Sequence, residues 1–298
     1  MTSRIRIIVA ALLLLLLLLC GCGVAPSEPS ATVSPEQTQS PEPEIVPFAA
    51  DEPVATPKPE IQKRFRTLFE QNPDFVGWLT VPGTPIDLPV VYCEDNEFYL
   101  SHDFERNPSQ MGTLFADMSY DPLENNGSLT IFGHFLAGDA MFGSLHRYKE
   151  LDYVRENPTF IFDGLYGDGE YIIFSVFYMA GNDDDEQFYY YPRSELYNEV
   201  GVKYHIRQLV TRTIIDTGVD IAVDDDIVIL TCCTYETADL RFSIAGRRLR
   251  PGEDPTELIR LADWNPDPLY PQKWYDLRGG EPKQLLSWEE IQQDKFSD

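Results

Sequence analysis

The sequence has little positive charge for its size. Its 298 residues include 23 Lys and Arg against 49 Asp and Glu, which gives a formal net charge of −26. Nonspecific nucleic-acid binding depends on clustered Lys and Arg side chains that displace counterions from phosphates. The deficit therefore excludes nucleic acid as a partner. With 43% hydrophobic residues, the chain can still bury a sizeable core in one large domain or two small ones.

Cysteine is also scarce, and its pattern excludes two kinds of site. The five cysteines form no pair of CxxC motifs, and their number is odd. The sequence therefore contains neither a disulfide framework nor a zinc-binding motif. The cysteines are Cys20, Cys22, Cys93, Cys232 and Cys233.

The N-terminus has the pattern of an export signal. Arg4 and Arg6 precede an unbroken apolar run at residues 7–19. A charged segment followed by an apolar segment of this length is typical of a secretory signal. We therefore expect the protein to leave the cytoplasm and to lie at the extracytoplasmic face of the membrane.

The end of the apolar run indicates how the chain is anchored there. Residues 19–23 read Leu-Cys-Gly-Cys-Gly and resemble a bacterial lipobox, with Cys22 as the acylated residue because Gly21 precedes it. The alternative is an uncleaved signal anchor over residues 7–25, which is just long enough to span a bilayer. Both interpretations make residues 1–23 a membrane-attachment segment.

Residues 24–60 are rich in Pro, Ser and Glu, with nine prolines. Such a composition buries too little apolar surface to fold, which predicts a disordered stalk. The stalk has one Lys against seven Asp and Glu, so most of the acidic excess lies beyond it.

Short apolar runs separated by turn signals dominate the region after residue 70, which predicts a mostly β barrel or sandwich with inserted helices. The expected strands are residues 76–81, 86–92, 112–116, 128–132, 159–162, 171–180, 227–232 and 241–245. The expected helices are residues 61–70, 141–155 and 193–215.

The C-terminal region, residues 250–298, is rich in Trp, Pro and Asp. It holds Trp264, Trp274 and Trp288, and we expect these large aromatic side chains to pack on the domain. Ser287 begins a capping-box pattern that predicts a final short helix.

The strand at residues 227–233 ends in two cysteines. Strand alternation places Cys233 and Thr231 on one face and Cys232 on the opposite face, toward the core. A returning strand brings Arg241 opposite Cys233 across a hairpin. A guanidinium near a thiol favours the thiolate and can stabilise an oxyanion, so this pair is a candidate for nucleophilic catalysis. An ordinary buried cysteine is the alternative.

His134 follows the strand at residues 128–132, with Gly133 expected to let the backbone turn and present the imidazole. The other histidines, His102, His146 and His205, are expected to be solvated or structural. His134 is therefore the candidate acid–base residue, the alternative being an ordinary histidine at a strand end.

These residues lie in segments that resemble the sortases, and class B sortases in particular, from about residue 65 to residue 249. The matching segments are residues 72–79 (NPDFVGWL), 84–91 (TPIDLPVV), 95–100 (DNEFYL), 112–115 (GTLF), 131–134 (IFGH), 138–145 (GDAMFGSL) and 229–235 (ILTCCTY), followed by Arg241.

The resemblance implies an eight-stranded sortase-like β-barrel at residues 61–249, with residues 250–298 as an extension that has no counterpart in the family. It implies a cysteine transpeptidase with catalytic His134, Cys233 and Arg241 that needs no metal or organic cofactor. Expected partners are secreted proteins with a C-terminal sorting motif and an amine of a peptidoglycan precursor resembling lipid II. Asn96, Leu100 and Thr231 are implied to bind the sorting motif.

The sequence departs from the family at Cys232, which replaces a threonine. Cys232 is therefore a rival nucleophile, although the spacing to Arg241 favours Cys233. The substitution, the acidity and the extension together leave a second function open, a non-catalytic surface lipoprotein that uses a degenerate sortase fold as a binding module. A papain-like hydrolase is disfavoured because its cysteine precedes its histidine.

The lipobox interpretation makes a direct prediction. Cells that express the chain and grow with a fatty-acid analogue should label the protein, and Cys22→Ala should abolish the label because it removes the acylated thiol. Labelling retained in Cys22→Ala, or an uncleaved N-terminus by mass spectrometry, would identify a signal anchor instead.

Overall fold

The computed structural model describes residues 59–121, 123, 128–181, 199–234, 237 and 239–283. The predicted leader, all but the last two positions of the stalk, the beginning of the helix predicted at residues 193–215 and the helix predicted from Ser287 lie outside these residues.

The described residues form strands β1 (Phe75–Thr80), β2 (Asp87–Val91), β3 (Leu114–Ala116), β4 (Ser128–Phe132), β5 (Thr159–Gly164), β6 (Glu170–Ala180), β7 (Ile215–Asp216), β8 (Ile227–Cys233), β9 (Leu240–Arg248) and β10 (Asp263–Trp264). The α-helices are α2 (Arg66–Gln71), α3 (Leu151–Glu156), α4 (Glu199–Arg212), α5 (Pro255–Leu258) and α6 (Gln272–Arg278). The 3₁₀-helices are η1 (Lys63–Phe65), η2 (Phe98–Leu100), η3 (Ala137–Asp139) and η4 (Phe142–Lys149).

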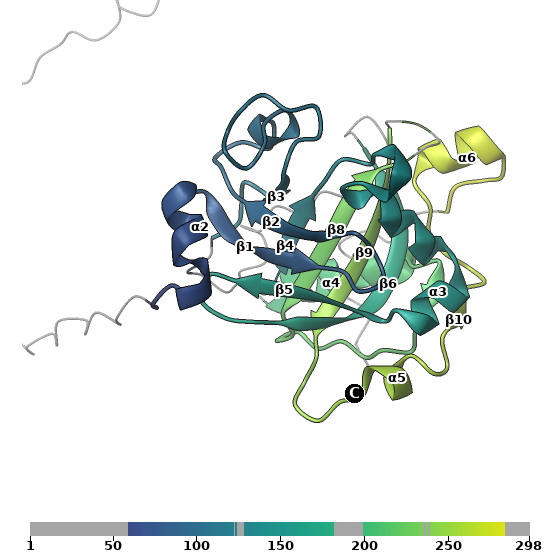
Figure 1. Ribbon diagram of the computed structural model, residues 1–298. Helices are drawn as coiled ribbons and strands as arrows, with labels where there is room; N and C mark the ends of the chain where they lie inside the picture. Colours follow the sequence, from purple (N-terminus) through teal and green to yellow (C-terminus); the bar gives the residue numbers. More distant parts are fainter. Residues whose placement is uncertain are drawn as a thin grey trace, which may run out of the picture. The chain divides into compact units, whose positions relative to one another are not determined.

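Eight strands close into a barrel in the order β1-β2-β3-β4-β8-β9-β6-β5 (Figure 1). Each of the eight predicted apolar segments forms one of these strands, which confirms the predicted eight-stranded, mostly β fold. Two pairs are parallel, β2 with β3 and β4 with β8, and the remaining neighbours are antiparallel. Closure gives each of these eight strands a neighbour on both sides, so none of them is an edge strand of the barrel.

Strands β6 and β8 are apolar on both faces because each separates two hydrophobic clusters. The inward side chains Val228 and Leu230 belong to the barrel core, whereas the outward Ile227 and Ile229 pack with Leu209 of α4. Helix α4 thus covers the outside of these strands (Figure 1). This burial on two sides explains why their sequences read as continuous apolar runs.

The helix predicted at residues 141–155 is divided in two. Glu150 is extended, with ψ of 126°, and it separates η4 from α3. Phe142, Leu145 and Tyr148 of η4 are fully buried. Their spacing of three residues is the period of a 3₁₀-helix, in which every third side chain shares a face.

The C-terminal region packs against the barrel domain. Strand β10 pairs with β7, and the amide of Leu269 donates to the carbonyl of Thr211 at 3.0 Å. The ring of Trp274 lies 4.5 Å from that of Tyr178 on β6, which confirms the predicted packing for this tryptophan. Trp264 is half exposed instead, because β10 lies at the surface, and Trp288 lies outside the described residues.

In the described part of the chain, no helix combines the length and apolarity needed to cross a bilayer.

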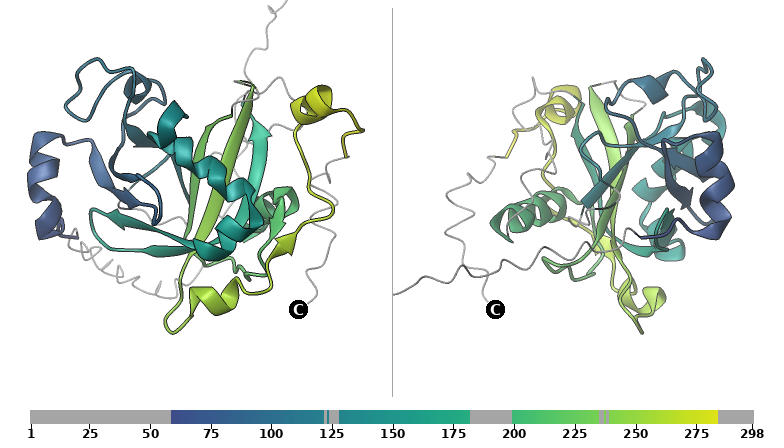
Figure 2. Two further views of the ribbon diagram at one scale, coloured as in Figure 1. Left: turned by 45° about the vertical axis from the view of Figure 1, so that its right-hand side comes forward. Right: turned by 90° about the vertical axis from the view of Figure 1, so that its left-hand side faces the viewer.

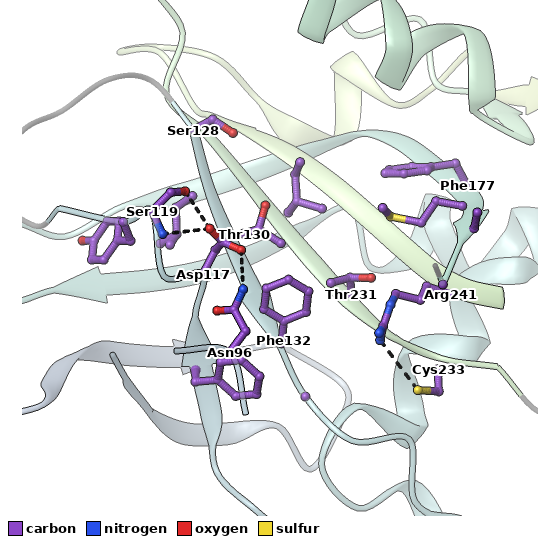
Figure 3. A pocket seen from close by; sticks show the side chains of 18 of the residues that line it. Asn96, Asp117, Ser119, Ser128, Thr130, Phe132, Phe177, Thr231, Cys233 and Arg241 are labelled. Carbon is purple, nitrogen blue, oxygen red and sulfur yellow. Dashed lines mark hydrogen bonds between the residues drawn. The ribbon is translucent and has the colours of Figure 1, made fainter. Parts of the chain in front are cut away.

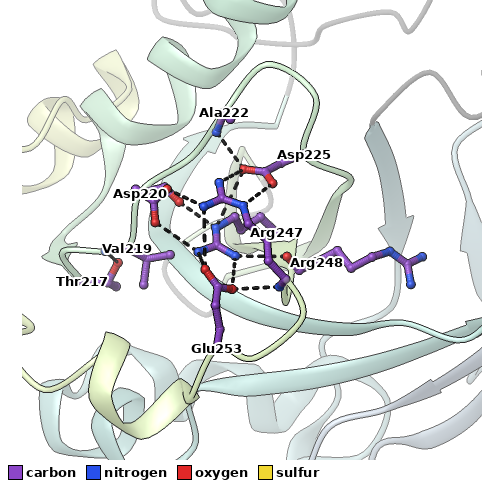
Figure 4. Close-up of polar contacts among 9 residues, drawn as sticks. Thr217, Val219, Asp220, Ala222, Asp225, Arg247, Arg248 and Glu253 are labelled. Atoms are coloured by element: carbon purple, nitrogen blue, oxygen red, sulfur yellow. Dashed lines mark hydrogen bonds and ion pairs between the residues drawn. The ribbon is translucent and has the colours of Figure 1, made fainter. Parts of the chain in front are cut away.

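Arg247 of β9 is fully buried and joins three parts of the fold (Figure 4). It donates to both carboxylate oxygens of Glu253, at 2.7 and 2.8 Å, and to the Asp220 carbonyl at 2.7 Å. Arg250 adds bonds of 2.6 Å to Asp220 and Asp225. The network ties β9 to the loop after β7 and to the turn after β9. A buried guanidinium is tolerated only when it is paired in this way.

These ion pairs make stability depend on pH. The hydrogen bond from Arg247 lowers the pKa of Glu253 below its ordinary value of 4.5, and the bond from Arg250 lowers the pKa of Asp220 below 3.8. A carboxylate with a lowered pKa stabilises the fold fully above its ordinary pKa, and this stabilisation is lost as the pH falls through its pKa in the folded protein.

Glu253→Gln should therefore lower the free energy of unfolding near pH 7 by about 1–3 kcal/mol, because buried Arg247 loses charged partners. The difference from wild type should shrink as the pH falls below 4.5 and through the lowered pKa of Glu253 in the folded protein, where the wild-type carboxylate becomes neutral. Denaturant titrations at several pH values measure both effects. Glu257→Gln, at an exposed carboxylate, is the matched control and should change little. A deficit in Glu253→Gln that is the same at every pH would contradict this account.

Candidate active site

The ends of β8 and β9 bring Cys233 and Arg241 together. The two residues are register partners, and Nη1 of Arg241 lies 3.7 Å from Sγ of Cys233, at hydrogen-bonding distance for a sulfur acceptor (Figure 3). Two residues back along the ladder, Thr231 and Ser243 are also partners, and their hydroxyls bond at 2.8 Å on the same face. Antiparallel pairing of β8 with β9 thus places Cys233 beside Arg241, as the hairpin in the sequence predicted.

Cys232 points the opposite way, as strand alternation predicts. It is fully buried in the barrel core beside its register partner Phe242, and its thiol lies 3.8 Å from the carbonyls of Phe142 and Phe242. Burial raises the pKa of the Cys232 thiol to about 12. This thiol is therefore neutral and shielded from solvent at neutral pH, which disfavours it as the nucleophile.

His134 reaches the same site from β4. This strand pairs in parallel with β8, where Phe132 is the partner of Thr231, and the Gly133 amide donates to the Thr231 carbonyl at 3.2 Å. His134 therefore continues β4 beside the end of β8 that carries Cys233. His134, which is distant in the sequence from Cys233 and Arg241, lines the same pocket because β8 has β4 on one side and β9 on the other.

Glycine is required at residue 133 by packing and not by a turn, contrary to the prediction. A Cβ atom there would lie 2.5 Å from Cδ2 of Leu114 and 2.7 Å from Cδ2 of Phe142. The backbone before His134 thus lies directly against the barrel core.

The carbonyl of Leu100 fixes the orientation of the His134 ring. It lies 2.7 Å from Nε2, and a carbonyl oxygen can only accept. Nε2 of His134 therefore carries a hydrogen, and in the neutral imidazole Nδ1 holds the lone pair. Gly112, with φ of 64°, leaves room beside the ring, since a Cβ there would lie 3.2 Å from Cδ2 of His134.

A pocket of about 370 Å³ lies along this part of the barrel and is lined by His134, Cys233 and Arg241. The three predicted substrate-binding residues, Asn96, Leu100 and Thr231, line it too. Figure 3 shows Asn96 and Asp117 away from Cys233, with Phe132 and Thr231 between them. The pocket is therefore an elongated groove that leads to the thiol.

Buried Asp117 orients the amide of Asn96. Nδ2 of Asn96 donates to Oδ2 of Asp117 at 3.0 Å, while Oδ1 accepts from the Met118 amide at 2.8 Å. Ser119 donates from its amide and its hydroxyl to Oδ1 of Asp117. Asp117 lines the pocket and was missed in the sequence, where it is one of many acidic residues.

Two of the remaining histidines also lie close to the site. Nε2 of His146 is 3.4 Å from the Cys233 carbonyl, and its ring packs between those of Phe135 and Phe242. His205 is buried in α4, where burial lowers its pKa to about 4, and its Nε2 lies 3.1 Å from the Ser128 hydroxyl. The sequence predicted that His146 and His205 are either structural or solvated. In the structure both histidines pack against neighbouring elements and therefore have structural roles. The contact between His146 and Cys233 had no sequence signal.

The difference between the two adjacent thiols is testable. Below about pH 10, iodoacetamide should modify Cys233 and leave Cys232 intact, because only the thiolate attacks and the Cys232 thiol is buried and protonated. Peptide mass spectrometry of the native protein separates the two sites, and the denatured protein, in which both should react, is the control. Faster modification of Cys232 in the native protein would contradict the assigned faces.

The chain is similar to two sortase B proteins, although no family model matches it. It is 27% identical to sortase B of Listeria monocytogenes over 177 residues, which cover 59% of this chain and 70% of the relative. Identity to sortase B of Staphylococcus aureus is 26% over 173 residues, which cover 58% and 68%.

Solved structures show the same fold. The Listeria monocytogenes sortase B structure matches with a TM-score of 0.54 and 26% identity, over 61% of this chain and 99% of that one. A Bacillus anthracis protein described as similar to sortase B matches with a TM-score of 0.58 and 23% identity, over 64% and 84%. A Staphylococcus aureus sortase B–substrate complex gives 0.56 and 22%, over 65% and 88%. The chain has the sortase fold, and the relatives and structures together support its placement in the class B sortase family.

Proposed function

We propose that this protein is a class B-like sortase, a cysteine transpeptidase that cleaves a C-terminal sorting motif of secreted proteins at a Thr-Xaa bond. The observation that carries the proposal is the pairing of Cys233 with Arg241 at 3.7 Å in a groove that His134 also lines. A nucleophile, an acid–base group and a fixed cation are the groups that acyl transfer through a thioester requires.

In the first half-reaction, the Cys233 thiolate attacks the carbonyl carbon of the motif threonine. The guanidinium of Arg241, with backbone N–H groups, stabilises the negative charge on the carbonyl oxygen. Protonated His134 gives its Nδ1 proton to the leaving amine as the C–N bond breaks, which leaves a thioester on Cys233. The Leu100 carbonyl accepts from Nε2 in both charge states of the ring, so the exchanged proton is the one on Nδ1.

In the second half-reaction, a peptidoglycan-precursor amine resembling that of lipid II attacks the thioester. Neutral His134 takes a proton from this amine at Nδ1, and the Cys233 thiolate leaves as the new amide forms. His134 thus returns to its starting charge. These steps use only side chains and backbone groups of the protein and need no metal or organic cofactor.

The groove suits an extended peptide. Asn96, held by Asp117, presents its remaining amide hydrogen, while Leu100 and Thr231 offer an apolar contact and a hydroxyl nearer the thiol. The Staphylococcus aureus structural neighbour is a sortase B–substrate complex, which supports a sorting peptide as the occupant of this groove.

Residues 1–23 would hold the enzyme at the extracytoplasmic membrane face, through a lipid on Cys22 or a signal anchor, where secreted substrates emerge.

Fluorogenic peptides carrying NPxTx or xPxTG motifs test the proposal. Wild type should cleave at least one of them, and Cys233→Ala should abolish cleavage. His134→Ala should lower kcat by about 10²–10⁴-fold, because it removes the acid–base group. Arg241→Ala should lower it by about 10²–10³-fold, because it removes an oxyanion donor.

Cys93→Ala is the matched control and should keep wild-type activity, since Cys93 is a partly exposed thiol that does not line the groove. Full activity in Cys233→Ala would overturn the proposed nucleophile. A wild-type chain that binds these peptides without cleaving them would instead identify the non-catalytic binding module.

A further inference from the structure

Helix α6 of the C-terminal region contacts the β8–β9 hairpin and its neighbour β6 at two separate points. Figure 2 shows this helix in yellow beyond the ends of the barrel strands. The two contacts are made by consecutive residues, Lys273 and Trp274. Both contacts lie within a few residues of Cys233 or Arg241 along the chain or across the sheet.

The first contact holds the connection between β8 and β9. Nζ of Lys273 lies 3.1 Å from Oδ2 of Asp239, which directly precedes β9. The Asp239 carbonyl also accepts from the Gly181 amide at 2.7 Å, so this position is tied to the end of β6 as well. Within the connection, the Thr234 hydroxyl donates to the Thr237 carbonyl at 3.1 Å.

The second contact supports the strands from the core side. The ring of Trp274 lies 4.5 Å from that of Tyr178 and is stacked at 4.3 Å on Tyr270. Tyr178 is the register partner of Phe242 on β9, and their rings meet edge to face at 5.3 Å. Phe242 directly follows Arg241 in the sequence.

The same aromatic contacts continue to the backbone of the nucleophile. The ring of Phe242 lies 5.1 Å from that of His146, and Nε2 of His146 is 3.4 Å from the Cys233 carbonyl. A continuous set of packed side chains therefore leads from Trp274 through Tyr178, Phe242 and His146 to Cys233.

We propose that α6 is a positioning brace for the catalytic hairpin, in which Trp274 and Lys273 keep the Arg241 guanidinium against the Cys233 thiol. Only the predicted effect on catalysis rests on the proposed function; the effect on the Cys233 thiol does not. Cys233 and Arg241 form the last register pair of the β8–β9 ladder. The ladder passes into the connection at this pair, so contacts that hold the connection and the neighbouring strand bear directly on their separation.

The two contacts contribute unequally. Lys273 and Asp239 are partly exposed, at 35% and 44%, and an ion pair in this setting contributes little because water screens it. Aromatic packing on the buried Tyr178 ring is the stronger restraint. Trp274 is therefore the main positioning residue and Lys273 the lesser one.

The test uses the full-length chain with Trp274→Ala, and Trp264→Ala as the matched control. Trp264 is a half-exposed tryptophan of the same C-terminal region, on β10. The rate of iodoacetamide modification at Cys233 is followed against pH by peptide mass spectrometry. In Trp274→Ala the midpoint should move to higher pH, because a more distant guanidinium favours the thiolate less. In Trp264→Ala it should match wild type.

Peptide cleavage supplies the second readout. Trp274→Ala should lower kcat by about tenfold while KM changes by less than about twofold, because the brace acts on the reacting groups and not on the groove. Trp274→Phe, which keeps an aromatic ring on Tyr178, should restore most of kcat. Lys273→Met should shift the midpoint in the same direction by less, and Lys273→Arg should restore it.

An unchanged alkylation profile in both Trp274→Ala and Lys273→Met would overturn the brace, as would an equal shift in Trp264→Ala. Should Trp274→Ala fail to fold, Trp274→Phe and the Lys273 variants carry the same comparison. A wild-type chain that cleaves no peptide would refute the proposed function, whereas the alkylation profiles would still decide the brace.

Discussion

The site depends on the pairing of β8 with two different neighbours. Its parallel partner β4 ends at Phe132, two residues before His134, and its antiparallel partner β9 carries Arg241. The ladder with β9 continues to Cys233 and the ladder with β4 continues to Thr231, so the two registers fix which segments lie beside Cys233. A shift of one residue in either ladder would turn the partner side chain to the other face of the barrel.

The same alternation separates two adjacent cysteines into different chemical environments. Cys232 belongs to the core and has a pKa raised by burial, whereas Cys233 faces the groove and Arg241. The departure from the class B pattern at Cys232 thus lies at a core position. On the groove side, the Thr231 hydroxyl bonds to that of Ser243. Cysteine at residue 232 therefore bears on packing and not on the reacting groups.

Acidic residues have two distinct roles in the part of the chain that the structure describes. Asp220, Asp225 and Glu253 neutralise the arginines that fasten β9 to its surroundings, and Asp117 orients a groove amide. The first set stabilises the barrel at a distance from the groove, whereas Asp117 shapes the groove itself. Part of the negative charge thus has a structural role, although the net charge of −26 is larger than the number of acidic residues in these contacts.

The sequence by itself determined the eight barrel strands, the opposite faces of Cys232 and Cys233, and the pairing of Cys233 with Arg241, because these follow from local periodicity and from one short hairpin. It also indicated His134 as a candidate acid–base residue at a strand end, and its resemblance to class B sortases added the groove residues. Only the tertiary structure decided that η4 is a 3₁₀-helix, that Gly133 is needed for packing, that His146 reaches the Cys233 carbonyl, and that Trp274 packs on Tyr178. Each of these depends on contacts between segments far apart in the chain, and such contacts are set by barrel closure, which no local pattern records.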